Sequence, residues 1–175
     1  MVSDFHPVIE LASLADVPSL PGIEARAAGL LDPQDLPPAI AVETTPVATY
    51  RTAVQEGRVL VARLASGGVA GFALMTEVDG SSHLEELDVD PEYGRRGFGR
   101  ALVAAATEWA AKRGDASITL STFKHVPWNA PFYATMGFKT LPTDQLSPAL
   151  QTIIDHEEAM GLNVSKRVVM RRDVS

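Results

Sequence analysis

Cysteine is absent from all 175 residues of the sequence. Disulfide bonds, thiol nucleophiles and thiolate metal sites are therefore excluded. Histidine is scarce as well, and the four in the chain include no pair at the spacing typical of metal ligands. We expect neither a metal site nor a cysteine-based mechanism.

Basic residues are the minority among the charged ones. Lysine and arginine total 15 against 22 aspartates and glutamates, which gives a formal net charge of −7. Because nucleic-acid binding needs a basic face, we expect no nucleic-acid partner. A cationic or neutral small molecule is compatible with this charge.

Long apolar runs are also missing. No stretch is apolar enough to span a bilayer, and the N-terminus lacks a charged leader followed by an apolar segment. We therefore expect a cytoplasmic protein with no membrane partner. The sequence leaves open whether this protein is a monomer or a homodimer.

What the chain does have is the composition of a globular protein. It is 46% hydrophobic, and 175 residues are enough to bury a sizeable core, so we expect residues 1–175 to form a single domain. Apolar patterning predicts strands at residues 7–14, 58–64, 69–78, 82–89, 117–122 and 164–172. It predicts helices at residues 49–56, 101–113, 131–136 and 148–160, and one more that contains Leu20, Ile23 and Ala27 and is capped by Asp16.

These elements predict an α/β protein with one mixed sheet and helices on both faces. The three strands between residues 58 and 89 are joined by short turns, so they should form an antiparallel meander. The strand–helix–strand unit over residues 82–122 should be right-handed, with its two strands parallel.

Residues 31–46 contain four prolines and are predicted to form a loop with one short helical piece. Long loops in compact domains are often functional. A flap that faces the substrate and a plain connector are both compatible with this segment.

Residues 84–103 combine a strand, a glycine-containing turn and the start of a helix. Pro91 ends the strand, and Gly97 and Gly99 allow an anion to approach the backbone. The first turn of a helix has unpaired N–H groups and a partial positive charge. Further positive charge comes from Arg95, Arg96 and Arg100. The stretch predicts a phosphate cradle; the alternative is an ordinary turn with surface arginines.

Two well-known phosphate loops do not match this stretch. A dinucleotide-binding fingerprint needs a third glycine where the chain has Leu102. A P-loop needs Gly-Lys-Ser or Gly-Lys-Thr, and the chain contains neither. The cradle must therefore be of another kind.

The sequence resembles the GCN5-related N-acetyltransferase (GNAT) superfamily over roughly residues 58–141. The resemblance lies in Val89-Asp90-Pro91, in residues 95–102 and in residues 133–138. Gly94 departs from the pattern, since the family often has Gln or Arg there, and Arg95 or Arg96 is then the donor that replaces it. The resemblance implies the GNAT fold, which is a mixed, mostly antiparallel twisted sheet with a splayed central strand pair.

The resemblance also implies acetyl-CoA as the cofactor, with CoA as the product. Its pyrophosphate would lie on the backbone amides of Arg95, Arg96, Gly97, Phe98, Gly99 and Arg100. Its pantetheine arm would add to the edge of the strand at Leu87, Asp88 and Val89, which requires a bulge that splays this strand from its neighbour. Asn129 resembles the asparagine that many members place near the cofactor arm.

Tyr133 lies four residues before Gly137 and matches the family tyrosine that protonates the leaving CoA thiolate. We therefore predict that Tyr133 is the general acid and also contacts the cofactor. The alternative is a core aromatic residue with a hydrogen-bonded hydroxyl.

The ammonium of an amine substrate must lose a proton before it can attack, so a base is needed. The candidates are His83, Glu85 and Glu86. Regular pleating places His83 and Glu85 on one face and Glu86 on the other, unless a bulge intervenes. The segment resembles arylalkylamine acetyltransferases, which have two histidines in place of His83 and Glu85. We favour His83 with Glu85 and keep Glu86 in reserve; all three are alternatively solvated surface groups.

The predicted function is direct acetyl transfer from acetyl-CoA to the primary amine of a small molecule in a ternary complex. A transferase that acetylates protein N-termini or lysines is one alternative. The other is a CoA or acyl-CoA sensor module without catalysis.

Four further polar residues lie outside these motifs. Glu24 is expected to be solvent-exposed rather than to meet a cationic substrate. His125 is a candidate for the mouth of the substrate site, and His6 and His156 are expected at the surface.

Overall fold

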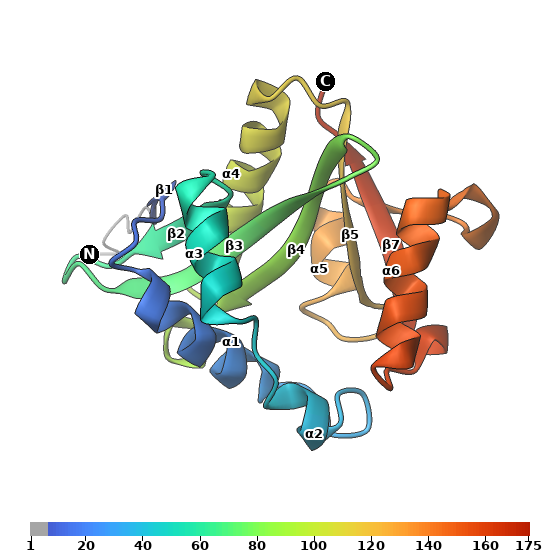
Figure 1. Ribbon diagram of the computed structural model, residues 1–175, viewed down its shortest axis with the longest axis horizontal. Coiled ribbons are helices and arrows are strands. Elements are labelled where there is room, and N and C mark those ends of the chain that lie inside the picture. Colours follow the sequence, from blue (N-terminus) through green and yellow to red (C-terminus); the bar gives the residue numbers. More distant parts are fainter. Residues whose placement is uncertain (1–6) are drawn as a thin grey trace.

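A seven-stranded sheet with the order β1-β2-β3-β4-β5-β7-β6 forms the centre of the computed structural model, which describes residues 7–175 (Figure 1). The strands are β1 Val8–Leu11, β2 Val59–Arg63, β3 Val69–Val78, β4 Ser81–Val89, β5 Ser117–Phe123, β6 Lys139–Thr140 and β7 Arg167–Asp173. Only β4 and β5 pair in parallel, and the other neighbours are antiparallel. The predicted mixed, mostly antiparallel sheet is confirmed, and the sheet is open.

Helices cover both faces of this sheet. They are α1 Leu20–Ala28, α2 Pro38–Ala41, α3 Val47–Gln55, α4 Phe98–Lys112, α5 Ala130–Thr135 and α6 Pro148–Ala159. Figure 1 shows α1 and α3 in front of the sheet and α4 behind it. Within residues 7–175, no helix is both long and apolar enough to cross a bilayer.

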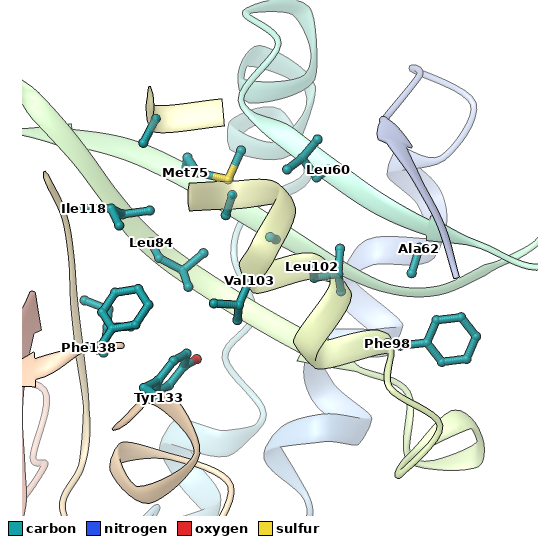
Figure 2. Close-up of a cluster of buried hydrophobic side chains, with 14 of the residues drawn as sticks. Leu60, Ala62, Met75, Leu84, Phe98, Leu102, Val103, Ile118, Tyr133 and Phe138 are labelled. Carbon is teal, nitrogen blue, oxygen red and sulfur yellow. The ribbon is translucent and has the colours of Figure 1, made fainter. Parts of the chain in front are cut away.

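Two buried clusters hold these layers together, one on each face. Strand β2 shows how the sequence builds both, because Leu60 and Ala62 join the cluster under α4, whereas Val59 and Val61 join the cluster under α1 and α3. Side chains alternate between faces along a strand, so a strand buried on both faces is apolar at every position. The α4 cluster draws on strands β2–β5 and on α4 and α5, and includes Tyr133 (Figure 2).

Several predicted boundaries were wrong. Strand β1 is shorter than residues 7–14, and the short strand β6 was not predicted. Asp16 does not cap α1, because its carboxylate accepts the backbone N–H of Ser13 and pairs with Arg63 at 2.7 Å. Residues 164–166 form a 3-10 helix, so β7 begins only at residue 167. The predicted position of His6 lies outside the described residues.

The central strands β4 and β5 separate along their length. They pair only from Ser82 to Leu84, opposite Ile118 to Leu120, and Figure 1 shows them diverging beyond that point. On its other side β4 contains a bulge, because Leu84 lies opposite Met75 while Glu86 lies opposite Leu74. Glu85 is therefore the extra residue. The splayed pair and its bulge agree with the expected fold.

Candidate active site

The bulge at Glu85 changes which β4 side chains share a face. Leu84, Leu87 and Val89 all contact the cluster under α4, although a regular strand would turn residues 84 and 87 to opposite faces. Glu86 and Asp88 consequently face the α1 and α3 side. The extra residue also puts His83 on the side of Glu86 and Asp88, whereas regular pleating places Glu86 on the opposite face, and His83 and Glu85 remain neighbours with Nε2 and Oε2 4.0 Å apart.

The splay leaves one edge of β4 without a strand partner. Residues 86–89 pair with β3, but no pairing with β5 extends beyond Leu84. The free edge therefore includes Leu87, Asp88 and Val89, the residues predicted to bind pantetheine. Gly71 keeps β3 close to this segment, because a Cβ at that position would lie 2.6 Å from the Asp88 carbonyl oxygen.

The predicted phosphate cradle lies between β4 and α4. Gly97 caps α4 with a φ of +83°, a left-handed conformation that favours glycine, and a Cβ there would have no heavy atom within 4 Å. Arg95 and Arg96 are exposed, whereas the Phe98 side chain is buried. A Cβ at Gly99 would make only ordinary contacts, the nearest at 3.8 Å from Val89, so the fold does not require glycine there.

Arg100 points away from the loop. Its guanidinium donates to the Thr135 hydroxyl at 3.0 Å and lies 5.8 Å from the centre of the Phe132 ring. The backbone N–H of Arg100 remains part of the first turn of α4, but its side chain ties α4 to α5. The charge available to an anion in the loop therefore comes from Arg95 and Arg96.

Helix α5 carries Tyr133 beside the splay. Asn129 fixes the start of α5, because its Oδ1 accepts the Thr122 hydroxyl at 2.6 Å and the Phe123 N–H at 3.4 Å. The Tyr133 ring is 8% exposed and packs edge-on against Phe138 at 5.7 Å (Figure 2). Burial raises the pKa of Tyr133, and the nearby charges of Asp88 and Glu86 raise it further. The hydroxyl therefore stays protonated at neutral pH.

His83 is almost completely buried, at 2% exposed. Its Nδ1 lies 2.8 Å from the Thr119 hydroxyl and its Nε2 lies 4.0 Å from Oε2 of Glu85, whose side chain is half exposed. Burial lowers the pKa of His83 to about 4. The imidazole is therefore neutral at physiological pH and is a weak proton acceptor.

Glu86 and Asp88 form the most perturbed carboxyl pair of the site. Burial raises the pKa of Glu86 well above its usual value, and the charges of Asp88 and Glu24 add to the effect. Burial and the Glu24 charge likewise raise the pKa of Asp88, while a hydrogen bond with the Glu86 carboxyl opposes this shift. Among the described residues, Oδ2 of Asp88 is buried without a hydrogen-bond partner. Perturbed carboxyls of this kind concentrate at functional sites.

Glu24 was predicted to be solvent-exposed, and that prediction was wrong. Its half-buried carboxylate on α1 accepts the backbone N–H of Thr45 at 2.9 Å and the Tyr50 hydroxyl at 2.5 Å. No local sequence signal indicates this, because its partners lie 21 and 26 residues away. His156, in contrast, is exposed as expected.

The segment between α1 and α3 is held to α1 at one end and to residues that follow β5 and precede β7 at the other. Thr45 holds one end of it on Glu24. Asp35, near the other end, is buried and lies 2.7 Å from Nε2 of His125 and 2.7 Å from Nζ of Lys166. His125, predicted at the substrate mouth, thus helps to hold this segment.

The family model described as "Acetyltransferase (GNAT) family" matches residues 31–138, more than half of the chain. This chain belongs to the GNAT acetyltransferase family. The family prediction is confirmed, and membership agrees with the predicted acetyl-CoA-dependent activity. The candidate functional features of this GNAT protein are the splayed β4 edge, the loop before α4, Tyr133 and the carboxyls beside it.

Known proteins resemble this GNAT chain to different extents. A mycothiol acetyltransferase of Clavibacter sepedonicus is 39% identical over 61 residues, which are 35% of this chain and 20% of that protein. The chain thus matches about a fifth of the length of this curated relative. The structure of the PaiA N-acetyltransferase of Thermoplasma acidophilum in complex with coenzyme A matches with a TM-score of 0.68 and 17% identity, covering 97% of this chain and 99% of that one.

A third similar protein is the ribosomal-protein-S18-alanine N-acetyltransferase of Escherichia coli. Its structure matches with a TM-score of 0.67 and 21% identity, and the match covers 97% of this chain and 95% of that chain. At these identities the two structures establish the shared GNAT fold.

Proposed function

We propose that this GNAT protein transfers the acetyl group of acetyl-CoA to the primary amine of a small molecule, by direct attack in a ternary complex. One observation carries the proposal: β4 and β5 splay beyond Leu84, with the cradle beyond the end of β4 and the Tyr133, Glu86 and Asp88 side chains beside the splay. We also propose that residues 1–175 act as one acetyltransferase domain. A cytoplasmic location and a monomeric or homodimeric state stay predictions.

The residues present fit a CoA molecule. The free edge of β4 offers backbone groups for strand-like addition of the pantetheine arm. The open space at Gly97 and the exposed side chains of Arg95 and Arg96 suit a pyrophosphate at the N-terminus of the 15-residue helix α4. When bound, acetyl-CoA supplies the acetyl thioester that reacts.

Glu86 is the proposed base, with His83 and Glu85 as the alternatives. A useful general base has a pKa near the working pH. Burial raises the pKa of Glu86 towards that range and lowers the pKa of His83 away from it. Glu86 takes the proton that the substrate ammonium loses, and the released amine forms the new C–N bond as the C–S bond breaks.

Tyr133 is the proposed acid. Its hydroxyl is protonated at neutral pH and belongs to a buried ring beside the carboxyls of β4. Tyr133 donates this proton to the leaving thiolate, so amide and thiol are the products. The second proton that the nitrogen loses as the amide forms passes to solvent, and the Tyr133 hydroxyl is reprotonated from solvent.

The segment between α1 and α3 favours a small acceptor. It is held to Glu24 at one end and to His125 and Lys166 at the other, which leaves less room for a polypeptide than for a small amine. The competing function is acetylation of a protein, because the ribosomal-protein-S18-alanine N-acetyltransferase has the same fold.

The first test is thiol release from acetyl-CoA in the presence of a panel of amines and of peptides with free N-termini or lysines. Release with small amines and not with peptides is the expected result. Release with peptides alone would support the protein acetyltransferase. Calorimetric binding of acetyl-CoA without thiol release for any acceptor would support the sensor module.

Replacement of Gly97 by valine tests the cradle. Valine resists the left-handed backbone at this position, at a cost of about 1–3 kcal/mol, so the loop must shift. We expect CoA affinity, measured by calorimetry, to fall by about tenfold or more.

Gly67→Val is the matched control, because Gly67 has a φ of +90° in the β2–β3 turn, away from the cradle. It should lower the melting temperature without changing CoA affinity. Equal CoA affinity in the Gly97 variant and the unmodified protein would remove the cradle from the site.

A further inference from the structure

Three carboxyl groups from two segments face the same region. Asp88 lies opposite Phe72 across the β3–β4 pair, and Glu86 lies opposite Leu74. The Phe72 ring contacts the Tyr50 ring at 5.5 Å, and the Tyr50 hydroxyl donates to Glu24. Helix α1, which carries Glu24, packs directly against β3 and β4.

No side-chain cation among residues 7–175 forms an ion pair with Glu24, Glu86 or Asp88. The groups that hydrogen-bond to Glu24 are neutral, from Thr45 and Tyr50.

Arg167 on β7 is the basic side chain whose charge acts on Glu86. Its guanidinium is already bound to Glu157 at 2.7 Å and lies 4.5 Å from the centre of the Phe123 ring. Apart from Arg167, no side-chain cation among the described residues holds these carboxyls in their ionised form, which agrees with the raised pKa of Glu86 and of Asp88.

A separate observation indicates that a ligand completes this region. Oδ2 of Asp88 is buried and has no hydrogen-bond partner among the described residues. A buried carboxylate oxygen without a donor is costly, and native proteins usually satisfy such atoms. A bound ammonium would supply both the missing donor and the missing positive charge.

We infer that the acceptor of this enzyme carries a second cationic group, as diamines and polyamines do, and that Glu24 and Asp88 bind it while Glu86 faces the amine that reacts. This inference rests on the proposed function for the reaction, but the binding of the second cation can be measured without turnover. The mutual effect of these carboxyls on their pKa values is consistent with their closeness.

The test compares 1,5-diaminopentane with 1-aminopentane, which have the same chain length and differ only in the second ammonium. Each amine is titrated calorimetrically into the full-length protein saturated with CoA. We expect the diamine to bind at least about tenfold more tightly, because a charge pair that is partly withdrawn from water is worth more than an exposed one.

Two variants locate the effect. Glu24→Gln and Asp88→Asn keep the shape of each side chain and remove its charge, and each should reduce the preference for the diamine to about twofold or less. Glu108→Gln is the control for net charge, because Glu108 is exposed on α4 and, within residues 7–175, its ion pair is with Lys112. This control should keep the full preference.

Three results would overturn the inference. These are equal affinity for the two amines, a preference that survives both variants, and tighter binding of Mg²⁺ than of the diamine with loss of that binding in Glu24→Gln. Thiol release is followed in parallel to separate the two proposals. Equal affinity with thiol release overturns only the second-cation site, whereas selective diamine binding without thiol release supports that site and contradicts acetyl transfer to these amines.

Discussion

Tyr133→Phe is expected to lower the turnover number about 100-fold, which is the lower range for loss of a general acid. The substitution keeps the ring that packs against Phe132 and Phe138 and removes only the hydroxyl. The affinity for acetyl-CoA should therefore change by no more than about twofold. Thiol-release kinetics measure the first quantity, and calorimetry with acetyl-CoA measures the second.

Tyr93→Phe is the matched control for this substitution. Tyr93 also packs edge-on against a phenylalanine, Phe98, and its ring lies 5.7 Å from the Arg96 guanidinium, so the acetyl-CoA affinity of this control is measured alongside its turnover. Its variant should keep normal turnover. If the Tyr133 and Tyr93 variants turn over at the same rate as the unmodified protein, Tyr133 is a core residue and not the acid.

Glu86→Gln is expected to lower turnover by about 100-fold or more, since glutamine has the same shape but cannot accept the substrate proton. Glu85→Gln, at the exposed bulge residue next to it, should have a much smaller effect. Measurement of kcat for both variants with one small amine decides between the two carboxyls. A larger loss in the Glu85 variant would return the role of base to Glu85.

The pH dependence of turnover separates Glu86 from His83. A base works only in its deprotonated form, so activity falls as the pH drops through the pKa of the base. Burial raises the pKa of Glu86, as do the charges of Asp88, Glu24 and Glu85, while Arg167 opposes them. The acidic limb should therefore lie well above pH 4.5 and should disappear in Glu86→Gln. A limb near pH 4 would identify His83 instead, because burial lowers its pKa to about 4.

The sequence was sufficient to predict the glycine turn before α4 and most of the sheet, because their signals are local. Gly97 follows two arginines directly before a helix, and β2 and the first part of β3 are nearly continuous apolar runs. The bulge is different in kind. It arises from how β4 pairs with Met75 and Leu74 on β3, so the pattern of β4 alone could not locate it at Glu85.

The surroundings of the site also depended on contacts distant in sequence. Asp35 meets His125 and Lys166 across 90 and 131 residues, and Glu24 meets Tyr50 across 26. Each of these acidic residues, taken alone, resembles a solvated surface group. Only the fold reveals that both are held by specific partners.

The bulge makes β4 two strand segments that are out of phase with each other. The segment before Glu85 and the segment after it each keep a period of two, but their apolar positions fall on Leu84 and then on Leu87 and Val89. Loss of Glu85 alone would leave Leu84 opposite Met75 and Glu86 opposite Leu74, so every side chain would keep its face, but β4 would become a regular strand without the bend that a bulge introduces. The extra residue therefore matters for the shape of β4 and not for which cluster each side chain enters.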